Sequence, residues 1–275
     1  MPYLLIAPAV ILCFIFRVVP LLLVAGLSAF ETNFITTAYV GFENYLQMFG
    51  DGEFWVSVGN TFLYVICTAP PLIFLALYVA SSAMFFKERN QHLTKILVYI
   101  PSLISGVIMA TIYRWIYHYD GPINWLVMKM GLERLMFFSS RWASVLPISA
   151  MMIIGGLGMP VIFFMAAMKA VPHEYFDIAR LEGATSRQIR RMIVIPCIAH
   201  TVALLSIMIA AGQLQTWGEI YMLAPYPYAA SMQYSIFHEG FLYGRFGPAS
   251  ARSVIMLIIV TVFILVQRKA QKWRM

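Results

Sequence analysis

The sequence predicts an all-α membrane protein with six transmembrane helices, and three observations support this. First, 61% of the 275 residues are hydrophobic and only 11% are charged, whereas soluble domains carry about 25% charged residues. Second, apolar runs of about the 20 residues needed to cross a bilayer core recur along the chain. Third, basic residues gather in alternate connections between those runs, as cytoplasmic segments do.

Six apolar runs are the candidate spans of a single transmembrane domain covering residues 1–275. The first run lacks the flanking features of a cleaved signal peptide and is expected to be retained. Prolines inside spans are tolerated in a bundle, and the GGLG run at 155–158 suits close helix contact. The last span is short unless it begins near Pro248. The predicted spans are residues 3–27, 58–86, 96–116, 142–168, 196–222 and 254–267.

The distribution of Lys and Arg predicts that both chain ends are cytoplasmic. Of the 19 basic residues, 12 lie in the second connection, the fourth connection and the carboxyl-terminal tail. The first connection, on the opposite side, has acids and no base. The net charge of +7 therefore reflects topology, and nucleic-acid binding is excluded because no aromatic–basic motif accompanies it. The 12 residues are Lys87, Arg89, Lys95, Lys169, Arg180, Arg187, Arg190, Arg191, Arg268, Lys269, Lys272 and Arg274.

Sequence motifs for covalent chemistry are missing. The chain contains no GxSxG, no GxxxxGK[ST] and no HExxH, and its three cysteines have no metal or redox spacing. We therefore expect no catalytic residue, no metal site and no enzyme activity in this chain.

One charged, helix-prone segment, residues 169–196, lies on the predicted cytoplasmic side between the fourth and fifth spans. Pro172 suits a first helical turn, and Glu174 follows where an acid favours the helix dipole. Gly183 permits a left-handed corner. Ser186 is the expected cap of a second helix. The segment is therefore predicted to form two short helices joined at a glycine.

Each of these two helices is predicted to be amphipathic, and Pro196 to mark the return into the membrane. A lipid-headgroup anchor and a docking element for another protein both fit the pattern; helical periodicity does not choose between them. The arginines expected to point away from the apolar faces are Arg187, Arg190 and Arg191. The apolar residues are Tyr175, Ile178, Ala179 and Leu181 in the first helix, and Ile189, Met192 and Ile193 in the second.

The spacing within the segment resembles the EAA loop of the membrane subunits of ABC importers, whose pattern is EAA, three residues, Gly, nine residues and I-x-L-P. Asp177-Ile178-Ala179 occupies the EAA position, Gly183 the glycine, and Ile193, Ile195 and Pro196 the end. Asp replaces Glu, Ile replaces the first Ala, and Ile replaces Leu. The segment is therefore identified as a coupling loop.

Three further stretches are similar to the carbohydrate-uptake branch of that family, which includes maltose and glycerol-phosphate permease subunits. They are YLLIAPAVILCFIFRVVPLLL, YVGFENYLQMFGDGEFWVSVGNTFLYV and GRFGPASARSVIMLIIV. Residues 224–227 depart from the T-x-GGP turn of many relatives. The external end of the pore, and hence the substrate, can differ from theirs.

The resemblance implies half of a translocation pore in a bacterial or archaeal cytoplasmic membrane. It implies a second homologous six-span permease, two ATP-binding subunits that hold ATP and Mg²⁺, and an extracellular or periplasmic solute-binding protein; this chain would bind no cofactor. Asp177 would pair with a base on the ATPase, Ala179 would allow close approach, and Gly183 would set the corner. The residues assigned to ATPase contact are Glu174, Asp177, Ile178, Ala179, Gly183, Ala184 and Arg187.

Polar and aromatic residues within the spans are the candidates for the substrate path. Arg17 lies roughly 21 Å along the first span and either faces the pore, snorkels outward or pairs with Glu219. If it faces the pore, an acidic or phosphorylated saccharide becomes a candidate. The outer half of the predicted fifth span, QLQTWGEIY, offers amides, a carboxylate and aromatic faces to a sugar. The path residues are Arg17, Gln213, Gln215, Trp217, Glu219 and Tyr221.

Two other functions stay open at this point. An ABC permease for another small polar solute fits the same motifs. An ion-coupled secondary transporter would use acids near the middle of the membrane, and Glu219 is the acid nearest to such a position.

Overall fold

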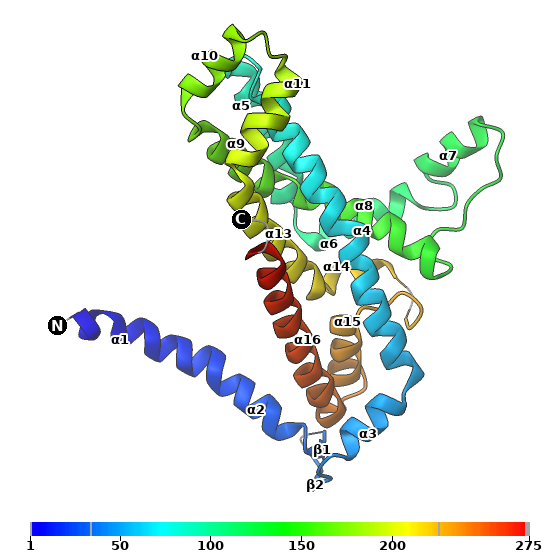
Figure 1. The fold of residues 1–275 in the computed structure, drawn as a ribbon. Helices are drawn as coiled ribbons and strands as arrows, with labels where there is room; N and C mark the ends of the chain where they lie inside the picture. Colours follow the sequence, from blue (N-terminus) through cyan, green and yellow to red (C-terminus); the bar gives the residue numbers. More distant parts are fainter. Residues whose placement is uncertain (1, 34, 225, 273–275) are drawn as a thin grey trace.

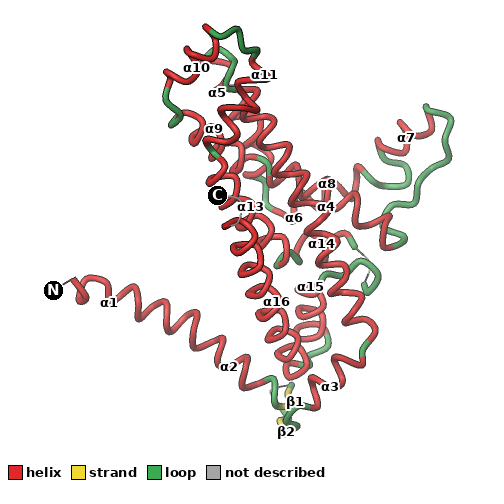
Figure 2. Tube along the Cα trace, in the orientation of Figure 1, coloured by secondary structure: helices red, strands yellow, loops and turns green. Residues whose placement is uncertain are grey.

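The computed structural model describes residues 2–33, 35–224 and 226–272, and most of them are helical (Figure 2). Among these residues the only strands are β1 (Phe30–Thr32) and β2 (Thr37–Tyr39), which form a short antiparallel hairpin. Figure 1 shows an open arrangement in which the amino-terminal helices lead away from the rest of the chain. The predicted helical character is therefore confirmed, with the hairpin as an addition.

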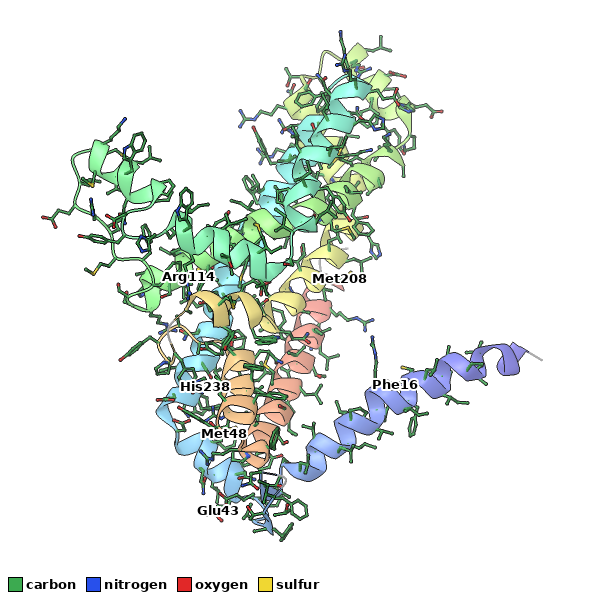
Figure 3. The ribbon with its side chains drawn as sticks, turned by 180° about the vertical axis from the view of Figure 1, so that it is seen from behind. Phe16, Glu43, Met48, Arg114, Met208 and His238 are labelled. Atoms are coloured by element: carbon green, nitrogen blue, oxygen red, sulfur yellow. The ribbon has the colours of Figure 1, made fainter. Side chains whose placement is uncertain are left out.

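The first apolar segment forms an arm that leaves the body of the molecule. It consists of α1 (Pro2–Cys13), a π-helical turn η1 (Phe14–Val18) and α2 (Val19–Leu27). No described side chain of η1 or α2 is buried, and Figure 3 shows Phe16 on the arm, apart from Met208 on the body. The arm has the length and hydropathy of a membrane span.

Helix α4 (Gly52–Ala83) runs through the body and organises the packing. It contacts α8 (Arg141–Gly156), α9 (Gly158–Lys169) and α13 (Ala199–Leu214). Because its side chains meet these helices, one side of α4 is buried, and that side carries polar residues such as Asn60 and Thr68 as well as apolar ones. It is joined at its amino end to α3 (Glu43–Gly50), which follows the hairpin.

The carboxyl-terminal helix α16 (Phe246–Lys272) forms the other long element. It packs against α2, α3, α13 and α15 (Met232–Phe237). The last predicted span, 254–267, is therefore too short, because the helix begins at Phe246, before Pro248. Of the basic tail, Arg274 lies outside the described residues.

Three of the predicted spans are bent. Three helices are individually long and apolar enough to cross a membrane, and the number reaches six only if each bent pair is one crossing. The first bent pair joins α5 (Glu88–Tyr99) and the 3₁₀ turn η2 (Ile100–Leu103) to α6 (Gly106–Ile116) at 93°. The second, α8 with α9, bends by 45°. The predicted spans over 96–116 and 142–168 therefore correspond to bent pairs and not to single straight helices.

The third bent pair carries the fourth connection back into the body. Helix α11 (Ser186–Ile189) continues through the π-helical turn η3 (Arg190–Val194) into α12 (Ile195–Cys197), which meets α13 at 70°. The predicted span 196–222 is wrong at its carboxyl-terminal end, because α13 ends at Leu214 and a separate helix, α14 (Gly218–Leu223), follows.

The bends have local causes. The backbone at Ile104 is extended, and the Ser105 side chain accepts a hydrogen bond from the N–H of Ile108, which starts α6 afresh. A Cβ at Gly158 would lie 2.6 Å from Ser102 Oγ, so glycine lets α9 approach η2 closely. The expectation of close contact at the GGLG run is confirmed there.

Two smaller elements complete the chain. Helix α7 (Pro122–Lys129) belongs to a loop that projects from the body between α6 and α8 (Figure 1). The π-helical turn η4 (His238–Leu242) continues α15 toward α16.

A buried apolar cluster connects the coupling loop to the body. Phe176 and Ile189 of the loop pack with Ala80 of α4 and with Val161 and Phe164 of α9. Close packing therefore fixes Phe176 and Ile189 against α4 and α9.

Candidate coupling and transport sites

The first helix of the coupling loop, α10 (His173–Leu181), ends at the predicted glycine corner. Gly183 has φ +77° and donates its N–H to the carbonyl of Arg180 at 3.0 Å, while Ala184 donates to Ala179 at 2.9 Å. These two bonds form a Schellman motif, which requires a left-handed residue after the helix. The predicted sharp turn between two helices is confirmed.

The second helix is capped differently from the prediction. Its N-cap is Thr185, not Ser186. The Thr185 hydroxyl accepts a hydrogen bond from the N–H of Gln188, and the Gln188 side chain accepts one from the N–H of Thr185 at 2.8 Å. This reciprocal capping box satisfies two amide groups that a helix start leaves open. Pro196 lies inside the continuing helical run, and the change of direction comes at Ile198.

The apolar residues of α10 divide between two sides. Phe176, which the periodicity argument left out, is buried, and Ala179 packs against the same cluster. Tyr175, Ile178 and Leu181 are exposed by 49%, 59% and 89%. The predicted single apolar face is therefore wrong: α10 has an inward anchor and an outward apolar face, which we call the outer face of α10.

The charged groups of the coupling loop are mostly open to contact. Asp177 and Arg180 form an ion pair at 3.7 Å, with side-chain exposures of 69% and 65%, and Glu174 and Arg187 are also exposed. Both members of the pair line a groove of about 420 Å³ between α10 and α5. An exposed pair of this kind contributes little to stability, so it is free to exchange for charges on a partner.

The arginines of the second helix do not behave alike. Arg190 donates to Ser82 Oγ at 3.0 Å and lies 5.5 Å from the centre of the Tyr78 ring, so it turns toward α4. Arg187 and Arg191 are exposed. The expectation that all three point away from the apolar face of their helix is wrong for Arg190, which turns toward α4.

The predicted path residues of the fifth span lie at a helix break. Gln213 belongs to the last turn of α13, Gln215 is its C-cap, and Trp217 is the N-cap of α14. Only Glu219 and Tyr221 lie within α14. These residues therefore turn in different directions instead of lining one side of a continuous helix.

A cavity of about 260 Å³, here called the break cavity, lies where the three bent or broken helices meet. Residues from the η2–α6 junction, from α8 and from the α13–α14 junction line it. Gln213, Thr216 and Glu219 supply polar side chains. The buried Gln213 Oε1 has no hydrogen-bond partner among the described residues. Broken helices at membrane depth are tolerated where they line a polar cavity.

Arg17 belongs to a different groove. It lines a mostly apolar space of about 390 Å³ between α2 and α16, together with Gln215 and Gln233. Arg17 and Glu219 therefore do not face each other, and the alternative that they pair is wrong. The six predicted path residues are not brought into one site.

Trp217 and Tyr221 join an aromatic cluster outside the break cavity. The Trp217 ring stacks on Phe237 of α15 at a centroid distance of 4.4 Å, and Tyr221 meets the edge of Tyr234 at 5.5 Å. The two side chains are 36% and 38% exposed. The contribution of α15 was missed because its residues follow the fifth predicted span.

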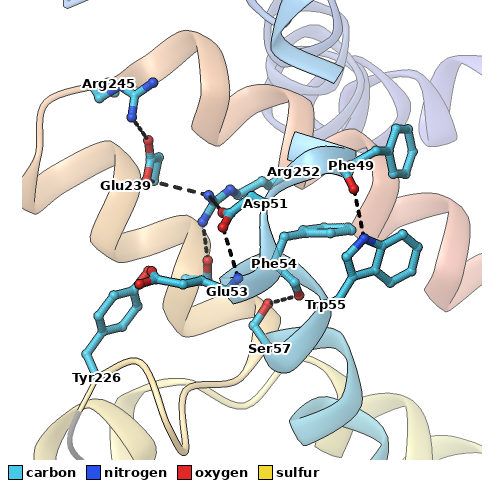
Figure 4. A network of polar contacts seen from close by, with 11 residues as sticks. Phe49, Asp51, Glu53, Phe54, Trp55, Ser57, Tyr226, Glu239, Arg245 and Arg252 are labelled. Carbon is cyan, nitrogen blue, oxygen red and sulfur yellow. Dashed lines mark hydrogen bonds and ion pairs between the residues drawn. The ribbon is translucent and has the colours of Figure 1, made fainter. Parts of the chain in front are cut away.

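Sequence reasoning also missed a buried ion-pair network, shown in Figure 4. Arg252 of α16 contacts Asp51 at 2.8 Å and Glu239 at 3.8 Å, and it donates to Ser235. Glu239 also pairs with Arg245 at 2.8 Å. Arg252 and Glu239 are only 7% and 4% exposed. No local sequence pattern points to this network, because Asp51 and Arg252 lie 201 positions apart.

Two titratable residues adjoin this network. Tyr226 donates to Glu53 at 3.1 Å, and burial, reinforced by that carboxylate, raises the pKa of Tyr226 to about 12. His238 stacks on Tyr226 at 3.8 Å, and burial lowers the pKa of His238 below its ordinary value. Within 224–227, where the sequence departs from relatives, Pro225 lies outside the described residues.

The fold is shared with a chain of a solved ABC transporter. It matches the crystal structure of a bacterial ABC transporter involved in the import of the acidic polysaccharide alginate, with a TM-score of 0.85 and 22% identity. The match covers 98% of this chain and 94% of the other.

Sequence comparison agrees. No family model matches, but the chain is 27% identical over 279 residues to the probable ABC transporter permease protein YesP of Bacillus subtilis (98% and 90% covered). It is 24% identical over 281 residues to the lactose transport system permease protein LacF of Rhizobium radiobacter (99% and 94% covered). Sequence and fold therefore both support the predicted resemblance to ABC transporter permease subunits.

Proposed function

We propose that the chain forms half of the translocation pore of an ATP-driven importer for a sugar or oligosaccharide. Each bent helix pair is taken as one crossing, which gives six spans with both ends in the cytoplasm. The distribution of Lys and Arg supports this orientation in a bacterial or archaeal cytoplasmic membrane. The names of relatives such as LacF, and of an alpha-glucoside permease of Rhizobium meliloti, support a saccharide cargo.

The coupling loop is the observation that carries the proposal. It holds a rigid corner at Gly183, an inward anchor at Phe176, and the exposed outer face of α10. Burying one apolar side chain such as Leu or Ile against a partner contributes roughly 1.5–3 kcal/mol to the free energy of binding. Tyr175, Ile178 and Leu181 therefore offer a compact docking surface, with Glu174, Asp177 and Arg187 available for charge pairing.

The proposed partner at this surface is an ATP-binding subunit, present in two copies that hold ATP and Mg²⁺. A second homologous permease completes the pore, and a solute-binding protein delivers the cargo. A solved alginate ABC transporter in complex with its pentasaccharide-bound periplasmic protein has a chain of the same fold. This chain itself binds no cofactor in the proposal.

Movement reaches the pore through packing. The ATP-binding subunits would displace α10, and the cluster around Phe176 would carry that displacement to α4 and α9. Helix α9 meets α8 at a 45° bend beside the break cavity. Helix junctions are places where rigid segments can change their relative angle, so the bends serve as the hinges of the gate.

Co-purification tests the proposal against the open alternatives. The chain, tagged and isolated from membranes of its native host, should bring down an ATP-binding subunit and a second permease, and saccharide uptake should require ATP. An ion-coupled transporter would bring down neither and would stop when the ion gradient is dissipated. Import of a different polar solute would leave the complex intact but give no saccharide uptake.

Single cysteines test the docking surface and the topology together. Cys13, Cys67 and Cys197 are first replaced by serine, because two of them are exposed. Leu181→Cys should cross-link to the ATP-binding subunit and resist an impermeant maleimide added to intact cells. The matched variant Leu132→Cys, 60% exposed in the loop that contains α7, should react with the maleimide and form no such cross-link. The reverse pattern would refute the orientation.

A further inference from the structure

The break cavity presents hydrogen-bond acceptors that lack donors. Gln213 Oε1 is buried without a partner, and the Glu219 carboxylate lines the same space. A carboxylate only accepts hydrogen bonds, whereas the Gln213 amide can also donate through its NH2 group. The Thr216 hydroxyl already donates to the carbonyl of Gly212. A buried acceptor left unpaired is costly, so the cavity favours a ligand rich in donors.

The carboxylate is held close against the start of α6. A Cβ at Gly106 would lie 2.9 Å from Glu219 Oε1, so the glycine makes room for this side chain. The amino end of a helix favours a negative charge nearby. Glu219 is the one ionisable side chain among the described residues that line the cavity.

No basic side chain of the described chain offsets that charge inside the cavity. Arg17, the residue that made an acidic cargo a candidate, lines a separate groove with Gln215. An acidic saccharide in the break cavity would therefore bring one carboxylate toward another with no cationic side chain between them, and like charges repel.

We infer that the break cavity is a charge-selective saccharide site, which accepts neutral or amino sugars through Gln213 and Glu219 and rejects acidic sugars. This inference rests on the proposed function and specifies its substrate class. Hydroxyl and ammonium groups supply the donors that the two acceptors need. A uronate supplies a further acceptor and a further negative charge. The cargo then differs in charge from that of the alginate transporter, despite the shared fold.

Equilibrium binding to the whole transporter tests the inference. The purified complex in nanodiscs, without solute-binding protein, is titrated at pH 7 with three radiolabelled probes: maltotriose, the glucosamine trisaccharide and trigalacturonate. The neutral and amino probes should bind at least about tenfold more tightly than the acidic probe. The inference would be overturned if trigalacturonate bound as tightly as maltotriose or more tightly, or if no probe bound at all.

Three variants assign the selectivity to this cavity. Glu219→Gln keeps the shape of the side chain and removes its charge. It should bring the affinities for maltotriose and trigalacturonate to within about threefold of each other. Gln213→Glu adds a second carboxylate and should enlarge the preference, so it tests the idea even if Glu219→Gln fails to assemble. Glu133→Gln, an exposed glutamate in the loop after α7, is the matched control and should change nothing.

The outcomes separate this inference from the proposed function. If Glu219→Gln and Gln213→Glu leave the ratio between probes as in Glu133→Gln, the site assignment is wrong. The importer assignment still stands in that case if an ATP-binding subunit co-purifies and uptake requires ATP. If no such subunit is found, the proposed function itself fails.

Discussion

The corner of the coupling loop allows a sharp test, because backbone handedness and side-chain space are separable there. Gly183 has φ +77°, and a Cβ at this position would meet nothing within 4 Å. A substitution therefore adds backbone strain without a steric clash. An L-residue in the left-handed region costs about 1–2 kcal/mol, and a β-branched residue lies at the upper end or beyond.

We predict that Gly183→Val uncouples ATP hydrolysis from saccharide uptake while the chain still inserts into the membrane. A cost of about 2 kcal/mol shifts the balance between formed and opened corner roughly thirtyfold. The two Schellman hydrogen bonds of Gly183 and Ala184 would then break for part of the time. Docked α10 would then move without carrying α11 and its buried Ile189 with it.

The assay is the number of ATP molecules hydrolysed per saccharide imported in proteoliposomes. The ratio should rise strongly for Gly183→Val and slightly for Gly183→Ala. Gly183→Asn is the matched control, because asparagine adopts the left-handed region readily, and it should couple almost as well as the wild type. Normal coupling in the valine variant would refute the reasoning. Equal damage from asparagine and valine would show that a side chain, and not handedness, matters.

Three further predictions concern the coupling-loop cap and the ion-pair network. Thr185→Ala removes one side of the capping box and should destabilise the start of α11 by about 1 kcal/mol. Faster amide hydrogen exchange at the start of α11 would reveal this loss, and Thr185→Asp should restore protection from exchange. Arg252→Met removes the base that Asp51 and Glu239 share and leaves Glu239 with Arg245 alone. Because losing one member of a buried ion pair costs up to about 3–5 kcal/mol, the melting temperature of the complex should fall; an unchanged melting temperature would contradict a structural role for Arg252. Because the pKa of His238 is lowered in the folded protein, the unfolded state binds a proton more readily than the folded state does. The contribution of His238 to folding stability should therefore be fully present above its ordinary pKa of 6.5 and be lost as pH falls through the lower folded value. His238→Phe, which keeps an aromatic ring against Tyr226, should flatten that dependence of melting temperature on pH, and a pH profile identical to the wild type would show that another group titrates.

Features governed by local physics could be predicted from the sequence. Composition alone excludes a water-facing surface, since 61% hydrophobic residues cannot cover a soluble domain. Gly183 was placed correctly because a left-handed residue after a helix is a local requirement. The resemblance of 169–196 to the EAA loop depends on spacing alone, and the structure has helices on both sides of its glycine.

The tertiary structure decided where the helices break and which polar residues meet. Hydropathy measures the transfer of side chains into lipid and contains no information on backbone direction, so the bends before α6 and α13 were missed. Arg17 and Glu219 were grouped by being polar within apolar runs, but packing sends them to separate spaces. Arg252 and Asp51 meet across 201 positions. Such contacts depend on how distant helices pack, which no local pattern records.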